Sequence, residues 1–449
     1  MRLLLTHGYF IDDDPKEQRI WKPYAPLGLL YLSSHLKQKG YAVEVYDSTF
    51  GSRQELFDLI DAGPPGIIGV CGNLMTRSNC VEITGRAKAA GWRVVVGGPE
   101  PANYPEEYLA GGADVVVQGE GELVLEELVA SEMDPSTLAS IPGIIFRGPD
   151  GQLVLTGPAR LIPDLDTQPW PDRDQVNMPL YLKTWREHHG HGSISLITAR
   201  GCPYHCNWCS HSVYGKTHRR RSPQATATEV EFLLDRYQPE MLWIADDVFT
   251  IHPGWILQYA AELKERGIRV PFECITRADR LNERIAATLA ELGCARVWIG
   301  SESGSQRILD AMQRGVTVEQ VRHAVALCKQ NGIETGMFLM WGYEGEDLSD
   351  IEATIDHVKA CRPDVFFTTV SYPIKGTPYF DKVADRVVNI RPWKETTDRE
   401  FKIAGRHSRQ FYQHADELLR SEMASDPEAQ RTAAAAREAL RLSYDGVEV

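Results

Sequence analysis

The sequence has no apolar segment long enough to cross a membrane. All of its hydrophobic runs are shorter than the roughly 20 consecutive apolar residues that a membrane helix requires. The first segment, Met1 to His7, turns polar after a few positions, so its apolar run is too short for a secretory signal peptide. We therefore expect a cytoplasmic protein without a transmembrane segment, and a peripheral membrane contact stays open.

An excess of positive charge is also missing. The chain has 48 Lys and Arg against 62 Asp and Glu, which gives a formal net charge of −14. Because affinity for nucleic acids depends on neutralising phosphates, this balance argues against a nucleic-acid-binding protein. One basic run, His218-Arg-Arg-Arg221, is open to two interpretations: a solvated face, or a contact with an anionic group of a substrate. We expect a small-molecule substrate.

Cysteine is scarce except in one short segment. Six of the nine cysteines are scattered and are typical of small core residues, but Cys202, Cys206 and Cys209 lie within eight residues. Nothing indicates an oxidising compartment, so we expect no disulfide. Thiolates bind iron–sulfur clusters, for which a full set is four, and three would leave one iron open to bind and activate a small molecule. A zinc site completed by His205 or His211 is the alternative.

Residues 1–140 alternate short apolar segments with segments of helical spacing. This rhythm predicts a Rossmann-like domain, a doubly wound parallel sheet, because strands buried on both faces are continuously apolar. Such sheets bind ligands at the carboxyl ends of their strands, although glycines there also serve as ordinary turn residues. The candidate ligand-binding residues at the expected strand ends are Gly72, Asn73, Thr76, Gly97, Gly98, Gly119 and Glu120.

The remainder of the chain divides into three further regions. Residues 141–190 are rich in proline and aspartate and predict an irregular linker, with one hairpin over 143–155. Residues 191–385 contain six strand–helix repeats, and residues 386–449 are a polar region with helical stretches. The last region is equally compatible with a substrate lid and with plain packing.

The Cys-x3-Cys-x2-Cys motif, with Trp208 before its last cysteine, resembles that of the radical S-adenosylmethionine (SAM) enzymes. The resemblance implies a [4Fe-4S] cluster on Cys202, Cys206 and Cys209, whose open iron chelates SAM. An electron, supplied by an external donor such as flavodoxin or ferredoxin, then splits SAM into methionine and a 5′-deoxyadenosyl radical. The six repeats match the open (β/α)6 partial TIM barrel of this family.

The resemblance also implies which side chains bind SAM at the barrel's strand ends. Asp246 and Asp247 would accept hydrogen bonds from its ammonium, and Arg277 would pair with its carboxylate. The alternatives are a turn or helix cap for the aspartates and a surface ion pair for the arginine. Glu302 and Ser303, in a Gly-x-Glu-Ser-Gly segment, correspond to the ribose site, Phe338 and Met340 to an adenine site or the core, and Trp208 to adenine stacking or cluster shielding.

Three segments of the first 140 residues resemble the cobalamin-binding domain of cobalamin-dependent radical SAM enzymes. They are Pro26-Leu-Gly-Leu-Leu-Tyr-Leu32, Val95-Val-Gly-Gly-Pro99 and Val117-Gln-Gly-Glu-Gly-Glu122. This branch contains the anaerobic magnesium-protoporphyrin monomethyl ester cyclase and many carbon methylases. The Asp-x-His-x-x-Gly signature is absent from the sequence, which implies cobalamin bound without a protein histidine on cobalt, or a vestigial domain without the cofactor.

These resemblances predict a cobalamin-dependent methyltransferase that methylates an unactivated carbon of a small molecule, natural product or lipid. A first alternative is a radical oxidative cyclisation or ring rearrangement. A second, from another class, is a sensor that binds cobalamin or metal without turnover. The acidic charge and the lack of a second cysteine triad near the N-terminus argue against methylthiolation of transfer RNA.

Overall fold

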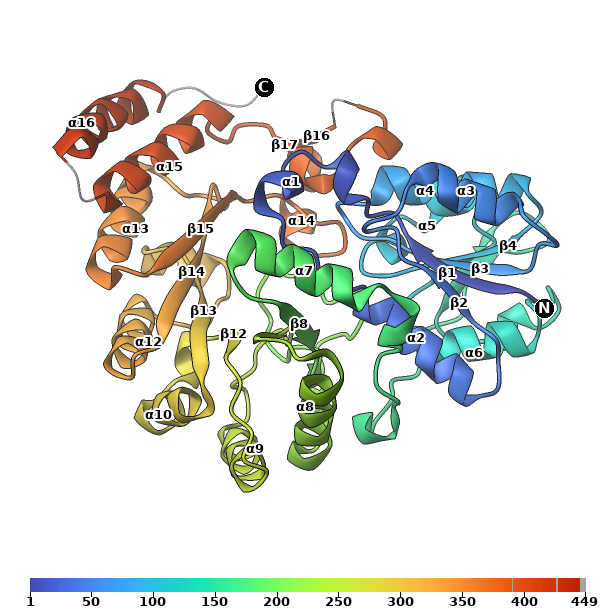
Figure 1. Ribbon diagram of the computed structural model, residues 1–449. Coiled ribbons are helices and arrows are strands. Elements are labelled where there is room, and N and C mark those ends of the chain that lie inside the picture. The colour runs from blue at the N-terminus through green and yellow to red at the C-terminus, as the bar shows by residue number, and fades with distance from the viewer. Residues whose placement is uncertain (390, 425–426, 445–449) are drawn as a thin grey trace. The chain divides into compact units, whose positions relative to one another are not determined.

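Figure 1 shows the fold of the chain in a computed structural model. The structure describes residues 1–389, 391–424 and 427–444; the remaining positions of the predicted C-terminal region lie outside the described residues. The chain forms two compact units. The first comprises Met1–Pro203, Ser210–Leu242 and Arg391–Thr397, and the second comprises Tyr204–Cys209, Trp243–Ile390 and Asp398–Val449.

The first unit is built on a seven-stranded sheet, which confirms the predicted doubly wound architecture. Its strands are β1 (Leu3–His7), β2 (Glu44–Tyr46), β3 (Ile67–Cys71), β4 (Arg93–Gly97), β5 (Val115–Val117), β6 (Ile144–Arg147) and β7 (Leu153–Leu155). They lie in the order β2-β1-β3-β4-β5-β6-β7, and the pairs from β2 to β5 are parallel. The strand order changes direction at β1, because β2 lies on one side of it and β3 to β5 lie on the other. Ligands of such sheets bind outside the carboxyl ends of the two strands at this point, here β1 and β3.

Helices cover both faces of this sheet (Figure 1). They are α2 (Leu27–Gln38), α3 (Arg53–Asp61), α4 (Arg77–Ala89), α5 (Pro105–Ala110) and α6 (Glu122–Ala130), and the short helix α1 (Glu17–Ile20) precedes them. Leu3 and Leu5 of β1 pack in one core with α2 and α6, whereas Leu4 packs in the other core with α3, α4 and α5. This alternation follows from strand geometry, in which successive side chains point to opposite faces.

The hairpin expected within the linker extends the first sheet. β6 pairs antiparallel with β5, and β7 pairs antiparallel with β6. Ile144 and Phe146 enter the core beneath α2 and α6, while Ile145 enters the opposite core. The apolar residues of β6 are therefore buried on both faces of the sheet, although the surrounding sequence has the composition of a connector.

The second sheet has six strands and matches the predicted partial barrel. They are β8 (Ser193–Leu196), β11 (Met241–Ile244), β12 (Phe272–Thr276), β13 (Cys294–Glu302), β14 (Glu334–Trp341) and β15 (Val365–Val370). Their order is β15-β14-β13-β12-β11-β8, and the pairs from β12 to β15 are parallel. The strands lie in the sheet in sequence order. A helix lies in each connection and returns the chain from the carboxyl end of one strand to the amino end of the next.

Side-chain caps fix where several of the remaining helices begin. The helices are α7 (Met178–His189), α8 (Pro223–Tyr237), α9 (Pro253–Glu265), α10 (Glu283–Leu292), α11 (Gln306–Ala311), α12 (Val318–Gln330), α13 (Leu348–Cys361), α14 (Pro378–Val383), α15 (Arg409–Met423) and α16 (Pro427–Leu442). Asn282, Thr317 and Asp347 each accept a hydrogen bond from a backbone amide of the first turn. These caps satisfy amides that have no partner within the helix.

The C-terminal region contains the predicted helical stretches, α15 and α16, and it also contains a short pair of strands. The short strands β16 (Val387–Val388) and β17 (Lys402–Ile403) pair antiparallel before α15. Between them, residues Arg391–Thr397 belong to the first unit, where Arg77 of α4 donates to the Thr396 carbonyl at 3.0 Å and faces the Trp393 ring at 4.9 Å. This buried arginine therefore anchors a segment that lies more than 300 residues further along the chain.

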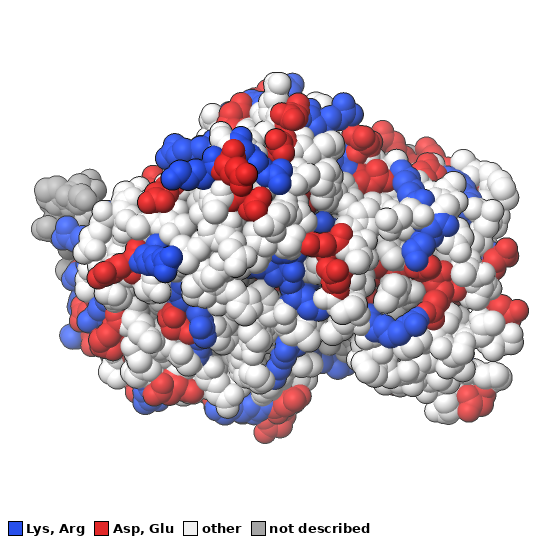
Figure 2. All heavy atoms as spheres, turned by 90° about the horizontal axis from the view of Figure 1, so that it is seen from below, with Lys and Arg blue, Asp and Glu red and all other residues white. Residues whose placement is uncertain are grey.

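Within the described part of the chain, no helix has both the length and the apolarity to cross a membrane. The molecular face in Figure 2 carries Lys and Arg interspersed with Asp and Glu. That face therefore has no continuous basic surface of the kind that binds a nucleic-acid backbone.

Candidate active site

The predicted SAM-binding segments lie at the carboxyl ends of neighbouring strands in the second unit. Asp246 and Asp247 follow β11, Arg277 follows β12, and Glu302 is the last residue of β13. Parallel strands end at the same edge of their sheet, so these segments occupy one edge. Phe338 differs, because it lies within β14 rather than at its end.

The three clustered cysteines lie in the loop between the short strands β9 (Ala199–Arg200) and β10 (Arg219–Arg220). Cys206 and Cys209 belong to the second unit, where the Cys209 amide donates to the Cys206 carbonyl at 3.2 Å, and Cys202 belongs to the first. All nine cysteines lie within the described residues, and none forms a disulfide. In the same residues, no three His, Cys, Asp or Glu side chains are gathered to hold a single metal ion.

Two arginines face the sulfur of Cys206. Nη1 of Arg277 and Nη1 of Arg314 each lie 3.9 Å from Sγ. The Arg277 guanidinium is held by Asp279, at 2.9 Å from Nε to Oδ1, and its centre lies 3.7 Å from the centroid of the Tyr204 ring. These two positive charges would offset the negative charge of a thiolate bound to metal, so this arrangement suits a cysteine that ligates metal.

Glu302 lies beside the same arginines in a strained backbone conformation. Its φ angle is 59°, which is uncommon for a residue with a side chain, and the register of β13 against β14 shifts at this point. The Arg314 Nε atom lies 3.6 Å from Glu302 Oε1, and Arg314 Nη2 donates to the Gly300 carbonyl at 3.0 Å. Burial raises the pKa of Glu302, while Arg314 and Arg277 oppose that shift.

Arg314 is the site residue that the sequence did not indicate. Its guanidinium contacts Cys206, Glu302 and Gly300. Arg314 follows α11 in a polar stretch without any recognisable motif. In the structure, the preceding Gln313 has an unusual φ of 52°, but this angle cannot be read from the sequence. Its place beside the cysteine loop arises entirely from the tertiary fold.

Ser303 and Gly304 hold the Glu302 turn against α13. Ser303 Oγ lies 3.1 Å from Thr354 Oγ1, which also accepts from the Gly304 amide at 2.9 Å. A Cβ atom at position 304 would lie 2.5 Å from the Ala353 carbonyl oxygen, so only glycine permits this approach. The Ser303 hydroxyl is therefore committed to the packing that places Glu302.

The two aspartates after β11 have different environments. Asp246 is buried, whereas Asp247 is exposed. The pKa of Asp247 is raised because its carboxylate is partly desolvated and because the negative charge of Asp246 lies beside it. A positively charged group placed here would be attracted to both carboxylates.

The aromatic and sulfur side chains of the predicted adenine site separate into two clusters. Phe338 stacks with Trp298, at 5.2 Å between ring centroids, in a group that includes Phe367. Met340 instead packs in a buried cluster against which the ring of Trp208 lies. The structure therefore brings Met340, but not Phe338, together with the cysteine loop.

The first unit contains an apolar cavity of about 110 Å³ that reaches from the carboxyl ends of its strands onto the face covered by α2 and α6. Leu5, Val95 and Val117 line it from the sheet. Gly69 also lines it, and a Cβ atom there would lie 2.7 Å from Leu5 Cδ2. Glycine in the middle of β3 thus gives space to the Leu5 side chain, and the cavity lies between the sheet and its helices, where a ligand could bind.

Only some of the residues predicted to bind cobalamin line this cavity. Gly97, Gly98 and Gly119 do, whereas Gly72, Asn73, Thr76 and Glu120 are not among its lining residues. Gly98 has a φ of 107° and lies so close to Gly72 that a Cβ atom would be 2.4 Å from the Gly72 carbonyl oxygen. Gly72 therefore lies where the loop after β3 and the loop after β4 approach each other closely.

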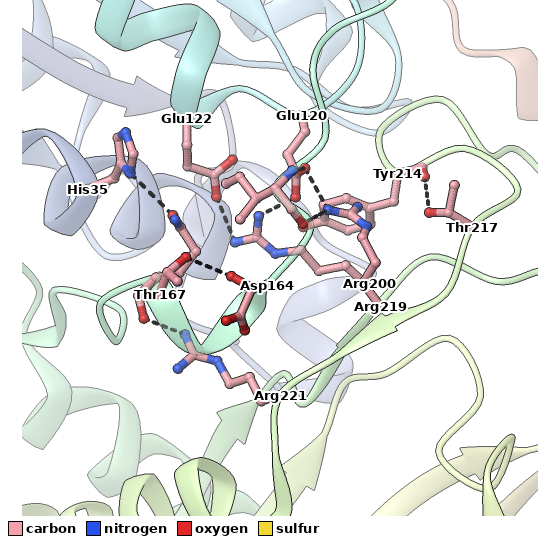
Figure 3. A network of polar contacts seen from close by, with 12 residues as sticks. His35, Glu120, Glu122, Asp164, Thr167, Arg200, Tyr214, Thr217, Arg219 and Arg221 are labelled. Atoms are coloured by element: carbon pink, nitrogen blue, oxygen red, sulfur yellow. Dashed lines mark hydrogen bonds and ion pairs between the residues drawn. The ribbon is translucent and has the colours of Figure 1, made fainter.

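Asn73, Thr76 and Glu120 are engaged in internal contacts. Asn73 Oδ1 accepts from the Met75 amide at 2.8 Å, and Thr76 Oγ1 accepts from the Asn73 amide at 3.0 Å, which closes the turn before α4. Glu120 forms ion pairs with Arg200 and Arg219 (Figure 3). Sequence reasoning could not identify these partners, since they lie 80 and 99 residues away.

Comparison with known protein families finds two domains in the chain. Residues 196–358 match the radical SAM superfamily, and residues 22–129 match the B12 binding domain. The chain therefore carries a B12-binding domain followed by a radical SAM domain, as the sequence motifs predicted. This pairing implies SAM, a [4Fe-4S] cluster and cobalamin as cofactors.

Curated relatives carry related names. The chain is 29% identical over 384 residues to an uncharacterized methyltransferase of Pyrococcus horikoshii, with 83% of this chain and 81% of that protein covered. It is 26% identical over 399 residues to the anaerobic magnesium-protoporphyrin IX monomethyl ester cyclase of Rubrivivax gelatinosus, with 86% and 71% covered.

Two solved structures share the fold. The cobalamin-dependent SAM radical enzyme OxsB, with aqua-cobalamin and SAM bound, superimposes with a TM-score of 0.76 at 18% identity over 99% of this chain and 71% of its own. The radical SAM methyltransferase TsrM of Kitasatospora setae, with cobalamin and a [4Fe-4S] cluster bound, gives 0.69 at 22% identity over 86% and 75%. At these low sequence identities, the similarity shows a shared fold and no more.

Proposed function

We propose that this protein is a cobalamin-dependent radical SAM methyltransferase that methylates an unactivated carbon of a small molecule. The observation that carries the proposal is the presence of both family matches, residues 22–129 and 196–358, in one chain. The names of several relatives support methylation as the reaction, including a hopanoid C-3 methylase that is 24% identical over 330 residues.

The cluster would be held by Cys202, Cys206 and Cys209. The donor chemistry fits, because the three are thiols of one loop and two guanidiniums lie beside the Cys206 sulfur. Arg277 and Arg314 would offset the negative charge of thiolate-ligated iron. The packing of Trp208 against buried apolar residues would keep water from that side of the loop.

SAM would be bound by side chains at the carboxyl ends of the second sheet. Asp246 and Asp247 would attract its ammonium group, and Glu302, oriented by Ser303 and Gly304, would accept from the ribose hydroxyls. Arg277 is already committed to Asp279, so it would pair with the SAM carboxylate only while keeping that bond. Met340 is better placed than Phe338 for adenine, since it shares a cluster with Trp208.

Cobalamin would be bound at the carboxyl edge of the first sheet. Gly97, Gly98 and Gly119 would let the backbone approach the cofactor, and the apolar cavity beneath them can take the flat aromatic base of its tail. This arrangement needs no histidine on cobalt, in keeping with the missing Asp-x-His-x-x-Gly signature. Gly72, Asn73 and Thr76 would act indirectly, by shaping the neighbouring loops.

When bound, the cluster supplies the electron that cleaves SAM and cobalamin carries the methyl group. The residues of this chain bind and orient these partners and exclude water, and no side chain is assigned as a general acid or base. We further propose that an external electron donor serves the cluster. The cofactor domains would correspond to the predicted ranges 1–140 and 191–385, with the first extended by the hairpin of β6 and β7. The cytoplasmic location stays a prediction.

A second candidate reaction is a radical cyclisation, which the similarity to the protoporphyrin ester cyclase favours. Both candidates can be tested without knowing the substrate. The reconstituted protein is incubated with SAM, hydroxocobalamin and a strong reductant under anaerobic conditions, and S-adenosylhomocysteine and 5′-deoxyadenosine are quantified. A methyltransferase releases both compounds. Release of 5′-deoxyadenosine alone would favour cyclisation, and release of neither would favour a non-catalytic sensor.

A further inference from the structure

The loop that carries the three cysteines is closed at its base by a short antiparallel pair of strands. Arg200 of β9 lies directly opposite Arg219 of β10. Residues 201–218, including all three cysteines, lie between these positions. The two arginines therefore mark the two ends of the cysteine loop.

One carboxylate binds both of these arginines, as Figure 3 shows. Arg200 donates to Glu120 Oε1, and Arg219 Nη1 donates to Glu120 Oε2 at 2.9 Å. The Ile162 amide also donates to Oε2, at 2.9 Å. The second guanidinium nitrogen of Arg200 binds Glu122 Oε1 at 2.6 Å. Both oxygens of Glu120 are thus used to hold the base of the loop.

This charge network is almost fully removed from solvent. The exposed fractions of the side chains are 1% for Glu120, 3% for Arg200, 6% for Glu122 and 12% for Arg219. Burial disfavours the charged form of Arg200, yet Glu122 and Glu120 raise its pKa. Two carboxylates balance two guanidiniums, so the removal of one charge leaves a buried partner uncompensated.

The same two segments form part of the wall of the apolar cavity. Gly119, Gly121 and Glu122 line it from the loop after β5, and Val213 and Tyr214 line it from the cysteine loop. The Tyr214 ring also faces the Arg200 guanidinium, at 5.4 Å. A molecule that fills the cavity therefore packs against both the carboxylate loop and the cysteine loop.

We propose that Glu120 is a positioning residue that couples the two cofactor sites. It fixes both ends of the cysteine loop to the rim of the cavity, so cobalamin in the cavity and the cluster in the loop stabilise each other. Holding the ends of a loop lowers the entropy lost when the loop is ordered, and a coupling between two binding equilibria is reciprocal. This inference rests on the proposed function, since it requires both cofactors.

The test compares Glu120→Gln with a matched control, Glu126→Gln. Glu126 is an α6 carboxylate of the same unit that pairs with His35 and Lys39. The rate of iron release to a chelator is measured on anaerobically reconstituted protein, with and without hydroxocobalamin. In the unaltered protein, hydroxocobalamin should slow the release. Glu120→Gln should release iron about 10- to 100-fold faster, which is the usual effect of losing a residue that orients metal ligands. Hydroxocobalamin should no longer slow the release from this variant. Glu126→Gln should behave as the unaltered protein.

Arg219→Gln provides a second variant, because it frees one end of the loop while Arg200 keeps both of its carboxylates. It should give a smaller acceleration of iron release and a changed electron paramagnetic resonance line shape of the reduced cluster. If circular dichroism shows that Glu120→Gln is misfolded, Arg219→Gln decides.

Three results would count against the proposal in different ways. Normal iron release with normal slowing in the folded variants overturns it. If the unaltered protein holds iron and cobalamin but hydroxocobalamin does not affect the release, the coupling is wrong while the proposed function stands. If the unaltered protein retains no iron or cobalamin, the proposed function itself fails.

Discussion

The contact between Arg314 and Glu302 provides a quantitative prediction. Arg314→Met keeps most of the side-chain volume but removes the cation that lies 3.6 Å from the Glu302 carboxylate. With an effective dielectric constant of about 20, the lost attraction is about 5 kcal/mol, which the relief of the buried guanidinium partly offsets. The lost hydrogen bond to the Gly300 carbonyl adds about 1 kcal/mol. We expect a net destabilisation of about 3 kcal/mol at pH 8.

The pH dependence of this destabilisation identifies its cause. Burial raises the pKa of Glu302, so the folded protein is destabilised as the pH rises above the ordinary carboxyl value of 4.5. Without Arg314 that pKa rises further, so protonation of Glu302 relieves more of the penalty at pH 5 than at pH 8. Urea unfolding of the apoprotein at pH 5 and pH 8, with and without Glu302→Gln, measures both effects. An equal penalty at the two pH values, or an undiminished penalty beside Glu302→Gln, would refute the reasoning.

Three further perturbations test other parts of the site. Val117→Phe should fill the cavity and weaken hydroxocobalamin binding at least about tenfold in an absorbance titration, and unchanged affinity would contradict the assignment of the cavity. Gly304→Ala should lower the free energy of unfolding by about 1–3 kcal/mol because of its contact with the Ala353 carbonyl, whereas Gly254→Ala, which would meet no atom within 4 Å, should not. Burial raises the pKa of Glu346 to about 8, so stability should fall as the pH rises from about 4.5 towards 8; Glu346→Gln should remove that part of the slope, and an unchanged slope would show that the carboxyl ionises normally.

The order of the elements could be predicted because buried parallel strands are recognisable in a sequence. Strands such as β3, β4 and β5 are short continuous apolar segments that end in glycines or polar residues, and the intervening helices have apolar faces at helical spacing. The cysteine spacing identified its loop for a similar reason, since metal ligands that are close in sequence need no tertiary information. The comparisons confirm the fold class and the family that these local signals predicted.

The partners of the site residues could not be predicted, because they depend on contacts between distant segments. Arg314 has no motif, and only the fold brings it to Cys206. Glu120 was predicted as a cobalamin contact, and its ion pairs with Arg200 and Arg219 could not be anticipated from the sequence. Phe338 was predicted as an adenine or core contact, and the structure stacks it with Trp298, whose indole passes over Gly336, where a Cβ atom would lie 2.3 Å from the ring.

The most direct test of the account is the formation of 5′-deoxyadenosine by anaerobically reconstituted protein supplied with SAM and dithionite. Cys206→Ser is the decisive variant, and Cys328→Ser, at a buried cysteine of α12 outside the loop, is its control. The account predicts that the unaltered protein and the control hold iron and release the nucleoside, while Cys206→Ser loses both properties. Undiminished release by Cys206→Ser, or zinc instead of iron in the unaltered protein, would contradict it.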